Sequence, residues 1–228
     1  PAGGSFRRVH LEPGSYGHWL RHLPALPAGT PVRSHRGRTI LRAGHPALAA
    51  VIDLDVGERN LQQCADTVMR LRGEYLFWRG RPGRIRLPWA GGLWFRFSHW
   101  RRGLRPVKRD GGWRLVRRAR PSRGYRSLRR YLRHMFIYTG TVHLARVPGV
   151  VGGDGDGGVD AAEVSPGDFF LQAGSPGHAV VVLDVARGDS GGPARVLLGQ
   201  GFMPAQDLHV LRAPDGSPWF RLPQPGKP

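Results

Sequence analysis

The pattern of hydrophobic and polar positions predicts a strand followed by a helix in the first third of the chain. Residues 49–56 (AAVIDLDV) alternate apolar and acidic positions, the two-residue period of a half-buried strand, and Gly57 ends it. Apolar residues then recur at three- and four-residue spacing, and Asn60 is a good N-cap, so we expect a helix from about Asn60 to about Phe77. Its apolar positions are Leu61, Cys64, Ala65, Val68, Leu71, Tyr75 and Leu76. Cys64 therefore falls in the first turns, on the inward face.

Weaker patterns predict shorter elements both before this strand and helix and in the stretch that follows them. Residues 16–23 (YGHWLRHL) indicate a short amphipathic helix that Pro24 ends. Residues 84–87 and 93–97 are typical of the two strands of a hairpin. A loop with little pattern follows from His99 to Gly124, and a second helix is expected over about 127–138.

The C-terminal third predicts three strands in succession. They are 168–171 (DFFL), 178–185 (HAVVVLDV) and 195–198 (RVLL), separated by a Gly-Ser-Pro-Gly turn and by a Gly-rich loop over 188–193. This is the pattern of an antiparallel meander. Helices in one part of the chain and a meander in another predict an α+β fold, which we expect to form one domain over 1–228 with a basic, loop-rich insertion at about 81–133.

The composition argues against a disordered protein and against a membrane-spanning one. The chain has 228 residues, of which 40% are hydrophobic and 9% aromatic, too apolar for a disordered chain despite 34 Gly and 20 Pro. No apolar run approaches the roughly 18 to 20 residues of a membrane span, so no transmembrane segment is expected. Because the chain begins at Pro1 instead of Met, we expect a processed form from which an export signal or lipoprotein anchor is already missing.

Positive charge is concentrated in the basic region, residues 81–133. This region holds 18 of the 35 Lys and Arg residues and one acidic residue, Asp110, and the net charge of the chain is +19. With its interleaved Trp and Tyr residues, it would attract an anionic polymer such as cell-wall glycan, phosphate polymer or nucleic acid. The candidate anion-binding residues are Arg101, Arg102, Arg105, Arg117, Arg118, Arg129 and Arg130. Nearly every cation is Arg, however, which GC-rich codon usage would also produce.

Cys64 is the only cysteine, which excludes an internal disulfide and a multi-thiolate metal site. A thiol becomes a nucleophile near a helix start and beside an imidazole that a third polar group orients. His178 opens a predicted strand after a turn, and Gln200 ends the next strand, where it would be adjacent to His178 in a hairpin. Asp184 lies six residues along the strand of His178, about 20 Å away, so Gln200 is the better orienter.

Two resemblances add to this interpretation. Residues 165–185 (SPGDFFLQAGSPGHAVVVLDV) resemble the segment of NlpC-type and CHAP-type papain-like cysteine peptidases in which the histidine begins a strand. Four stretches of the chain resemble the bacterial domain-of-unknown-function family 4846. They are YGHWLRHLP, AAVIDLDVGERNLQQCADTVMRLRGEYL, PGDFFLQAGSPGHAVVVLDVA and MPAQDLHVL. The first resemblance implies a papain-like fold in which the Cys64 helix packs on the meander, with Cys64 as nucleophile, His178 as base and Gln200 as orienter. The second implies a bacterial envelope location more than a reaction.

Plainer interpretations of the same residues remain open. A lone Cys on an apolar helical face is more often a core residue than a nucleophile, and His178 alone would be an ordinary strand-edge histidine. Papain-like nucleophiles usually lie at the very start of their helix, whereas Cys64 would lie a turn deep in a helix that begins at Asn60.

Asp53 and Asp55 share one strand face, where ion pairs to arginine are favoured over paired acid and base chemistry. His18, His22, His35 and His45 lack the tight spacing of a metal site with these carboxylates, and residues 151–160 lack the pattern of a calcium-binding loop.

The sequence thus supports two hypotheses of different classes. One is a papain-like thiol hydrolase or amidase of the bacterial envelope, or a secreted one, which cleaves cell-wall peptide without a cofactor or metal. The other is a non-catalytic envelope module that binds an anionic polymer, with nucleic acid among the candidates, through the basic region. The sequence leaves a cytoplasmic location, the substrate and the oligomeric state open.

Overall fold

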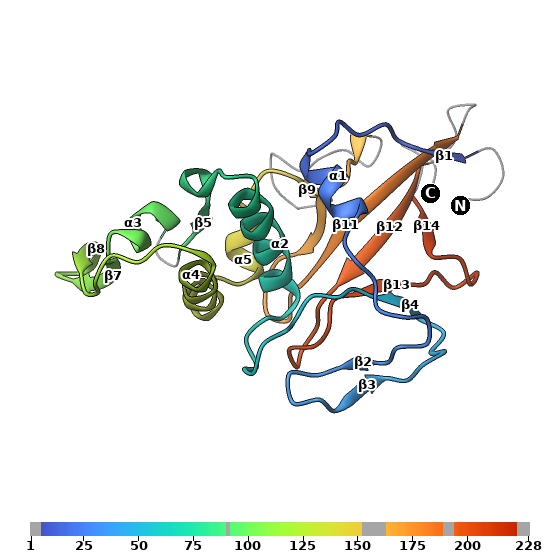
Figure 1. Ribbon diagram of the computed structural model, residues 1–228, viewed down its shortest axis with the longest axis horizontal. Coiled ribbons are helices and arrows are strands. Elements are labelled where there is room, and N and C mark those ends of the chain that lie inside the picture. Colours follow the sequence, from blue (N-terminus) through green and yellow to red (C-terminus); the bar gives the residue numbers. More distant parts are fainter. Residues whose placement is uncertain (1–5, 90–91, 152–162, 189–193, 223–228) are drawn as a thin grey trace.

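The computed structural model describes residues 6–89, 92–151, 163–188 and 194–222, and they form a mixed α+β fold (Figure 1). One eight-stranded sheet has the path β4-β13-β12-β11-β10-β9, with β1 added beside β11 and β14 beside β12. Its strands are β1 (Phe6–Arg8), β4 (Leu48–Val51), β9 (Val150–Val151), β10 (Phe169–Gln172), β11 (His178–Gly188), β12 (Arg195–Gln200), β13 (His209–Leu211) and β14 (Trp219–Arg221). The predicted meander is the antiparallel series β10, β11 and β12 in this sheet.

The other elements are helices and three separate hairpins outside the large sheet. The hairpins are β2 (Val32–Arg33) with β3 (Thr39–Leu41), β5 (Arg86–Pro88) with β6 (Trp94–Arg96), and β7 (Leu104–Arg109) with β8 (Gly112–Arg117). The helices are α1 (Tyr16–Arg21), α2 (Cys64–Trp78), the 3-10 helix η1 (Pro82–Arg84), α3 (Phe97–Arg101), α4 (Tyr125–Tyr138) and α5 (Thr141–Leu144). No helix among the described residues is both long and apolar enough to cross a membrane.

The basic region has more regular structure than its sequence predicted. Residues 104–117, expected as part of a loop, form the β7–β8 hairpin in continuous register from Leu104 opposite Arg117 to Arg109 opposite Gly112. The tight turn between the strands places Asp110 at φ 48° and Gly111 at φ 76°, a left-handed pair typical of a two-residue hairpin turn. The prediction of a loop was wrong because the charged residues on both strands hide the two-residue period. Figure 1 shows this hairpin and α3 projecting away from the large sheet.

One hydrophobic core joins α2, α4 and the sheet. Val68 and Leu71 of α2 belong to the same buried cluster as Leu128 and Leu132 of α4 and Val181 of β11. Gly73 of α2 makes room for α4, since a Cβ there would lie 3.2 Å from a methyl group of Leu132. The core therefore fixes α2 between the basic region and the meander.

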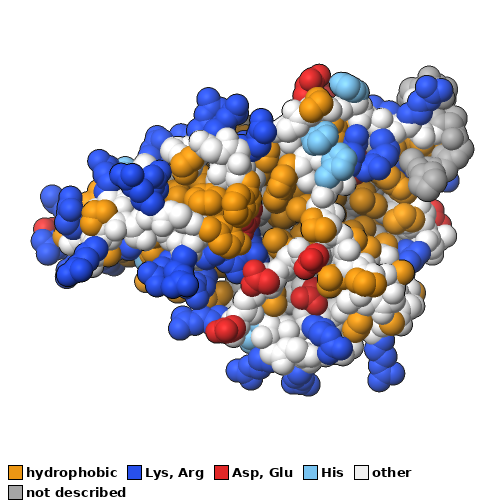
Figure 2. All heavy atoms as spheres, viewed as in Figure 1, with side chains coloured by type: hydrophobic (Ala, Val, Ile, Leu, Met, Phe, Trp, Pro, Cys, Tyr) orange, Lys and Arg blue, Asp and Glu red, His pale blue; other side chains and the backbone are white. Residues whose placement is uncertain are grey.

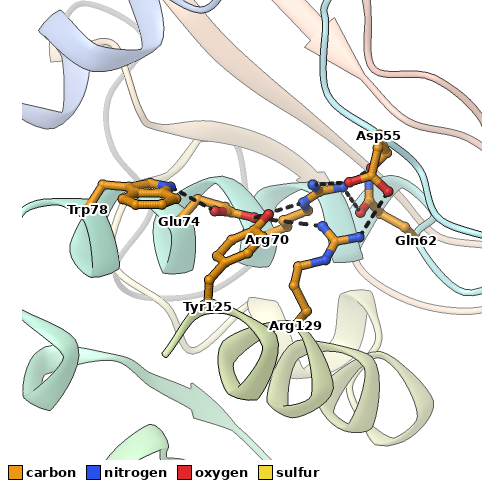
Figure 3. A network of polar contacts seen from close by, with 7 residues as sticks. All are labelled: Asp55, Gln62, Arg70, Glu74, Trp78, Tyr125 and Arg129. Atoms are coloured by element: carbon orange, nitrogen blue, oxygen red, sulfur yellow. Dashed lines mark hydrogen bonds and ion pairs between the residues drawn. The ribbon is translucent and has the colours of Figure 1, made fainter. Parts of the chain in front are cut away.

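A fully buried guanidinium, that of Arg70 on α2, anchors the segment that precedes this helix (Figure 3). It donates to the Asp55 carboxylate at 2.9 Å, to the backbone carbonyl of Asp55 and to the Gln62 side-chain oxygen at 2.6 Å. Its Nε lies 3.3 Å from a carboxylate oxygen of Glu74, one turn further along α2. Asp55 also accepts from Arg129 of α4 at 3.2 Å. Arg70 therefore holds residues 55–62 against the helix.

We expect Arg70→Met to lower the free energy of unfolding by about 3–5 kcal/mol, because it leaves the buried Glu74 carboxylate and Gln62 oxygen without this cation. Urea unfolding followed by circular dichroism measures the change. Arg126→Met, at an exposed position on α4, is the control and should stay within about 0.5 kcal/mol of the wild type. If both substitutions changed the free energy of unfolding equally, the Arg70 network would not contribute to stability beyond an exposed arginine.

Candidate active site

Cys64 is the first residue of α2. The N-cap is Gln63, whose backbone N–H donates to the Asp66 carboxylate at 3.0 Å. The helix begins four residues later than predicted because Asn60 has another role: its side-chain oxygen accepts the backbone N–H of Ala205 at 2.7 Å. Cys64 therefore lies where the unpaired N–H groups of a helix start favour a negative charge.

His178 and Gln200 meet at the ends of neighbouring strands. β11 begins at His178 and β12 ends at Gln200, and the antiparallel pairing of Val181 with Gly199 makes the two residues diagonal neighbours on one face. Nε2 of His178 lies 2.7 Å from the side-chain oxygen of Gln200. Because an amide oxygen only accepts, Nε2 carries the proton of this hydrogen bond.

The thiol and the imidazole interact. Partial burial alone would raise the pKa of the Cys64 thiol, but the His178 ring and the N–H groups of Ala179 and Ala65 outweigh it and lower this pKa below its ordinary value. In turn, the interaction with Cys64 raises the pKa of His178 against the opposing effect of its burial, and Gln200 adds to the rise.

Nδ1 is the ring nitrogen of His178 that Gln200 leaves available to the thiol. It is buried and makes no hydrogen bond of standard distance and angle within the described residues. The contact between the thiol and the imidazole is therefore looser than a standard hydrogen bond.

Two glycines allow neighbouring segments to pack closely beside the site, one after β12 against α2 and one before β11 against α5. A Cβ at Gly201, the residue after Gln200, would lie 2.5 Å from the Thr67 hydroxyl and 3.1 Å from the Gln63 carbonyl of the first turn of α2. A Cβ at Gly177, the residue before His178, would lie 2.3 Å from the Thr141 hydroxyl of α5. Any side chain at either position would displace the backbone that carries a residue of the site.

An exposed apolar side chain borders the site. The ring of Phe202 stands edge-on to the His178 ring with 5.1 Å between centroids, and 46% of its surface is exposed. Met203 beside it is also exposed. These two side chains form an apolar rim next to the imidazole.

The other acidic and histidine candidates lie in other contacts. Asp184 is fully buried in ion pairs with Arg8 and Arg21, and it contributes nothing to His178. Asp55 belongs to the Arg70 network, and Arg70 and Arg129 lower its pKa against the opposing effect of burial. The rings of His18 and His22 contact each other with 4.3 Å between their centroids and a tilt of 32° between their planes. Within the described ranges, no three His, Cys, Asp or Glu side chains are grouped so as to hold a metal ion. Residues 152–160 of the acidic loop lie outside the described residues.

The seven candidate arginines of the basic region differ in their contacts and exposure. Arg129 is paired with Asp55 and Glu74, and Arg105 stacks on the Trp100 ring and donates to the Trp100 carbonyl. Arg101 is half-buried, while the remaining four are exposed: Arg102, Arg117, Arg118 and Arg130. Figure 2 shows Lys and Arg side chains gathered along the projecting end of the molecule, with most of the visible acidic side chains elsewhere.

His209 is a residue of the site that the sequence did not indicate. It is the first residue of β13 and lies directly opposite Gln200 in the sheet, with its Nε2 3.3 Å from the Gln200 amide nitrogen. Sequence periodicity could not find it, because β13 (His209–Leu211) has only three residues and shows no reliable period.

Comparison with known proteins identifies the family. A family model described as domain of unknown function (4846) matches residues 1–227, so the chain belongs to this family. A search of curated proteins gave no match, and neither did a search of solved structures.

We expect the Cys64 thiol to be alkylated by iodoacetamide with a rate midpoint below the ordinary thiol pKa of about 8.5, because its lowered pKa makes thiolate available at lower pH. His178→Ala should move the midpoint up, since it removes the imidazole that lowers this pKa. Mass spectrometry of the labelled protein between about pH 5 and 10 measures both. A thiol that reacts only after unfolding would instead be a core residue.

Proposed function

We propose that this protein is a thiol hydrolase with papain-like chemistry that cleaves amide bonds. The observation that carries the proposal is the meeting of Cys64, at the start of α2, with an imidazole whose Nε2 is held by Gln200 at 2.7 Å. A nucleophile, its base and an orienting group in contact are the parts that covalent acyl transfer needs. The resemblance of residues 165–185 to NlpC-type and CHAP-type peptidases supports the same chemistry.

In the proposed reaction, the Cys64 sulfur attacks the amide carbonyl after its proton passes to Nδ1 of His178. The Cys64 backbone N–H, which has no acceptor within α2, donates to the oxyanion. His178 then gives its proton to the leaving amine as the carbon–nitrogen bond breaks, which leaves an acyl thioester on Cys64. Water, deprotonated by His178, attacks the thioester and releases the carboxylic acid and the free thiol.

The proposed substrate is a peptide of the bacterial cell wall, and the proposed location is the cell envelope or the exterior. Both follow from the two family resemblances. The apolar rim of Phe202 and Met203 gives the side chains beside the scissile bond an apolar contact.

We expect Cys64→Ala to abolish release of new amino groups from cell-wall peptide while leaving the fold intact, because Ala favours the helix. Cys64→Ser should lose nearly as much, since a hydroxyl is a weaker nucleophile than a thiolate. His178→Ala should cost about as much as Cys64→Ala, because nucleophile and base act as a unit, whereas Gln200→Ala should leave a residual rate. Mass spectrometry of the peptide products measures the rates. Activity that survives Cys64→Ala would rule the mechanism out.

A second function is supported by the exposed arginines of the basic region. The exposed arginines are Arg102 at the end of α3, Arg117 at the end of β8, Arg118 directly after it and Arg130 on α4. Asp110 is the only acidic residue between 81 and 133. We propose that this surface binds an anionic polymer of the envelope, with nucleic acid as an alternative ligand. It would act with the hydrolase, or alone if the thiol is inert.

Binding of this surface to heparin should weaken about 100-fold between roughly 50 and 200 mM salt, if four arginines each displace about one counterion. The double substitution Arg117→Ala and Arg118→Ala should lower both the affinity and the slope. Arg36→Ala with Arg38→Ala, at exposed positions outside the basic region, makes the same change in charge and is the control. Fluorescence titration measures the affinities, and an affinity that stays constant to about 0.5 M salt would contradict the proposal.

A further inference from the structure

His209 lies behind Gln200, on the side away from His178. It is fully buried at the start of β13, and Gln200 is its direct partner across the antiparallel pair. The side chains of His178, Gln200 and His209 thus form a row across three neighbouring strands, with hydrogen-bond distances of 2.7 Å and 3.3 Å between them.

The backbone determines which nitrogen of His209 carries the proton. Nδ1 lies 3.0 Å from the backbone carbonyl of Asp207, and since a carbonyl only accepts, Nδ1 is the donor. Burial lowers the pKa of His209 despite the opposing effects of the Asp207 carbonyl and carboxylate, so the ring is neutral at physiological pH. The Nε2 atom of His209 is therefore an acceptor.

An acceptor at this position selects one of the two orientations of the Gln200 amide. With the amide nitrogen toward His209 and the oxygen toward His178, both hydrogen bonds form. Turning the amide around would place the oxygen against the unprotonated Nε2 of His209, where neither atom can donate. The reversed orientation would leave two buried acceptors facing each other without a proton, so it is strongly disfavoured.

We propose that His209 is a positioning residue, which fixes the Gln200 amide so that His178 keeps its proton on Nε2 and presents a bare Nδ1 to Cys64. This inference rests on the proposed function, because it assigns His209 to the same site. Gln200 alone cannot do this, since an amide can turn either its oxygen or its nitrogen toward the imidazole. The reversed amide would require a proton on Nδ1 of His178, and that nitrogen could then take no proton from the thiol.

The test is the pH profile of Cys64 alkylation by iodoacetamide in the whole chain, where Cys64 is the only thiol. His209→Leu removes the acceptor, and we expect a reaction that is up to about tenfold slower at pH 7, the most that a one-unit rise in the thiol pKa can produce. His209→Gln keeps an acceptor oxygen at a similar reach and should restore most of the rate. In a Gln200→Ala background, His209→Leu should have no further effect, because His209 acts through Gln200.

His134→Leu is the control for loss of a half-buried histidine outside the site. Its ring contacts Trp89 and Trp100, so the substitution should lower the melting temperature and leave the alkylation profile unchanged. A folded His209→Leu protein with the wild-type profile would overturn the inference while leaving the proposed function standing. A wild-type thiol with no lowered midpoint would overturn the proposed function instead.

Nitrogen NMR of the labelled wild-type protein tests the same inference if His209→Leu does not fold. We expect the neutral His178 ring to show a protonated Nε2 and an unprotonated Nδ1, with its signals assigned by their absence in His178→Ala. Neutral His209 should show the opposite pattern. A proton on Nδ1 of neutral His178 would overturn the inference, whatever the thiol does.

Discussion

The position of the candidate nucleophile depends on one buried charge, the guanidinium of Arg70. A cation with 1% of its side chain exposed is tolerable only when its donors are matched by acceptors, since removing it from water costs several kcal/mol. Those acceptors come from Asp55, Gln62 and Glu74, which lie before α2 and within it. The network is satisfied only when residues 55–62 fold back along the helix, and this brings the chain into Cys64 from a fixed direction. The hydrogen bond from Ala205 to Asn60 ties the same segment to the far side of the site.

The imidazole side of the site needs no such network, because the pairing of the strands in the sheet fixes where its side chains lie. Backbone pairing across β11, β12 and β13 fixes which side chains stand next to each other, so His178, Gln200 and His209 are brought into a row by register alone. The remaining freedom is the distance between this row and the first turn of α2. Gly201 sets that distance, because its missing side chain lets Thr67 and Gln63 rest directly on the backbone after β12.

The sequence predicted the elements with a clear period and missed those whose shape depends on distant partners. The alternation in residues 178–185 and the spacing of Val68, Leu71 and Tyr75 were enough to find β11 and α2, and the order of turns was enough to place Gln200 beside His178. The start of α2 was missed because Asn60, a good N-cap by its chemistry, caps nothing and instead binds a residue 145 positions away. His209 was missed because its role comes from a pairing in the sheet that no local pattern records.

A comparison within the first turn of α2 separates the effect of the helix start on the Cys64 pKa from the effect of the imidazole. Asp66 lies two residues further on, and backbone N–H groups at the same helix end donate to it, yet burial raises the pKa of its carboxyl to about 8. Helix N–H groups are therefore insufficient here to keep a buried acid ionised. The pKa of Cys64 moves down despite partial burial, and the neighbour that Asp66 lacks is the His178 ring. The lowered pKa of the thiol thus follows from the imidazole more than from the helix start, and so from the strand ends that hold the imidazole in place.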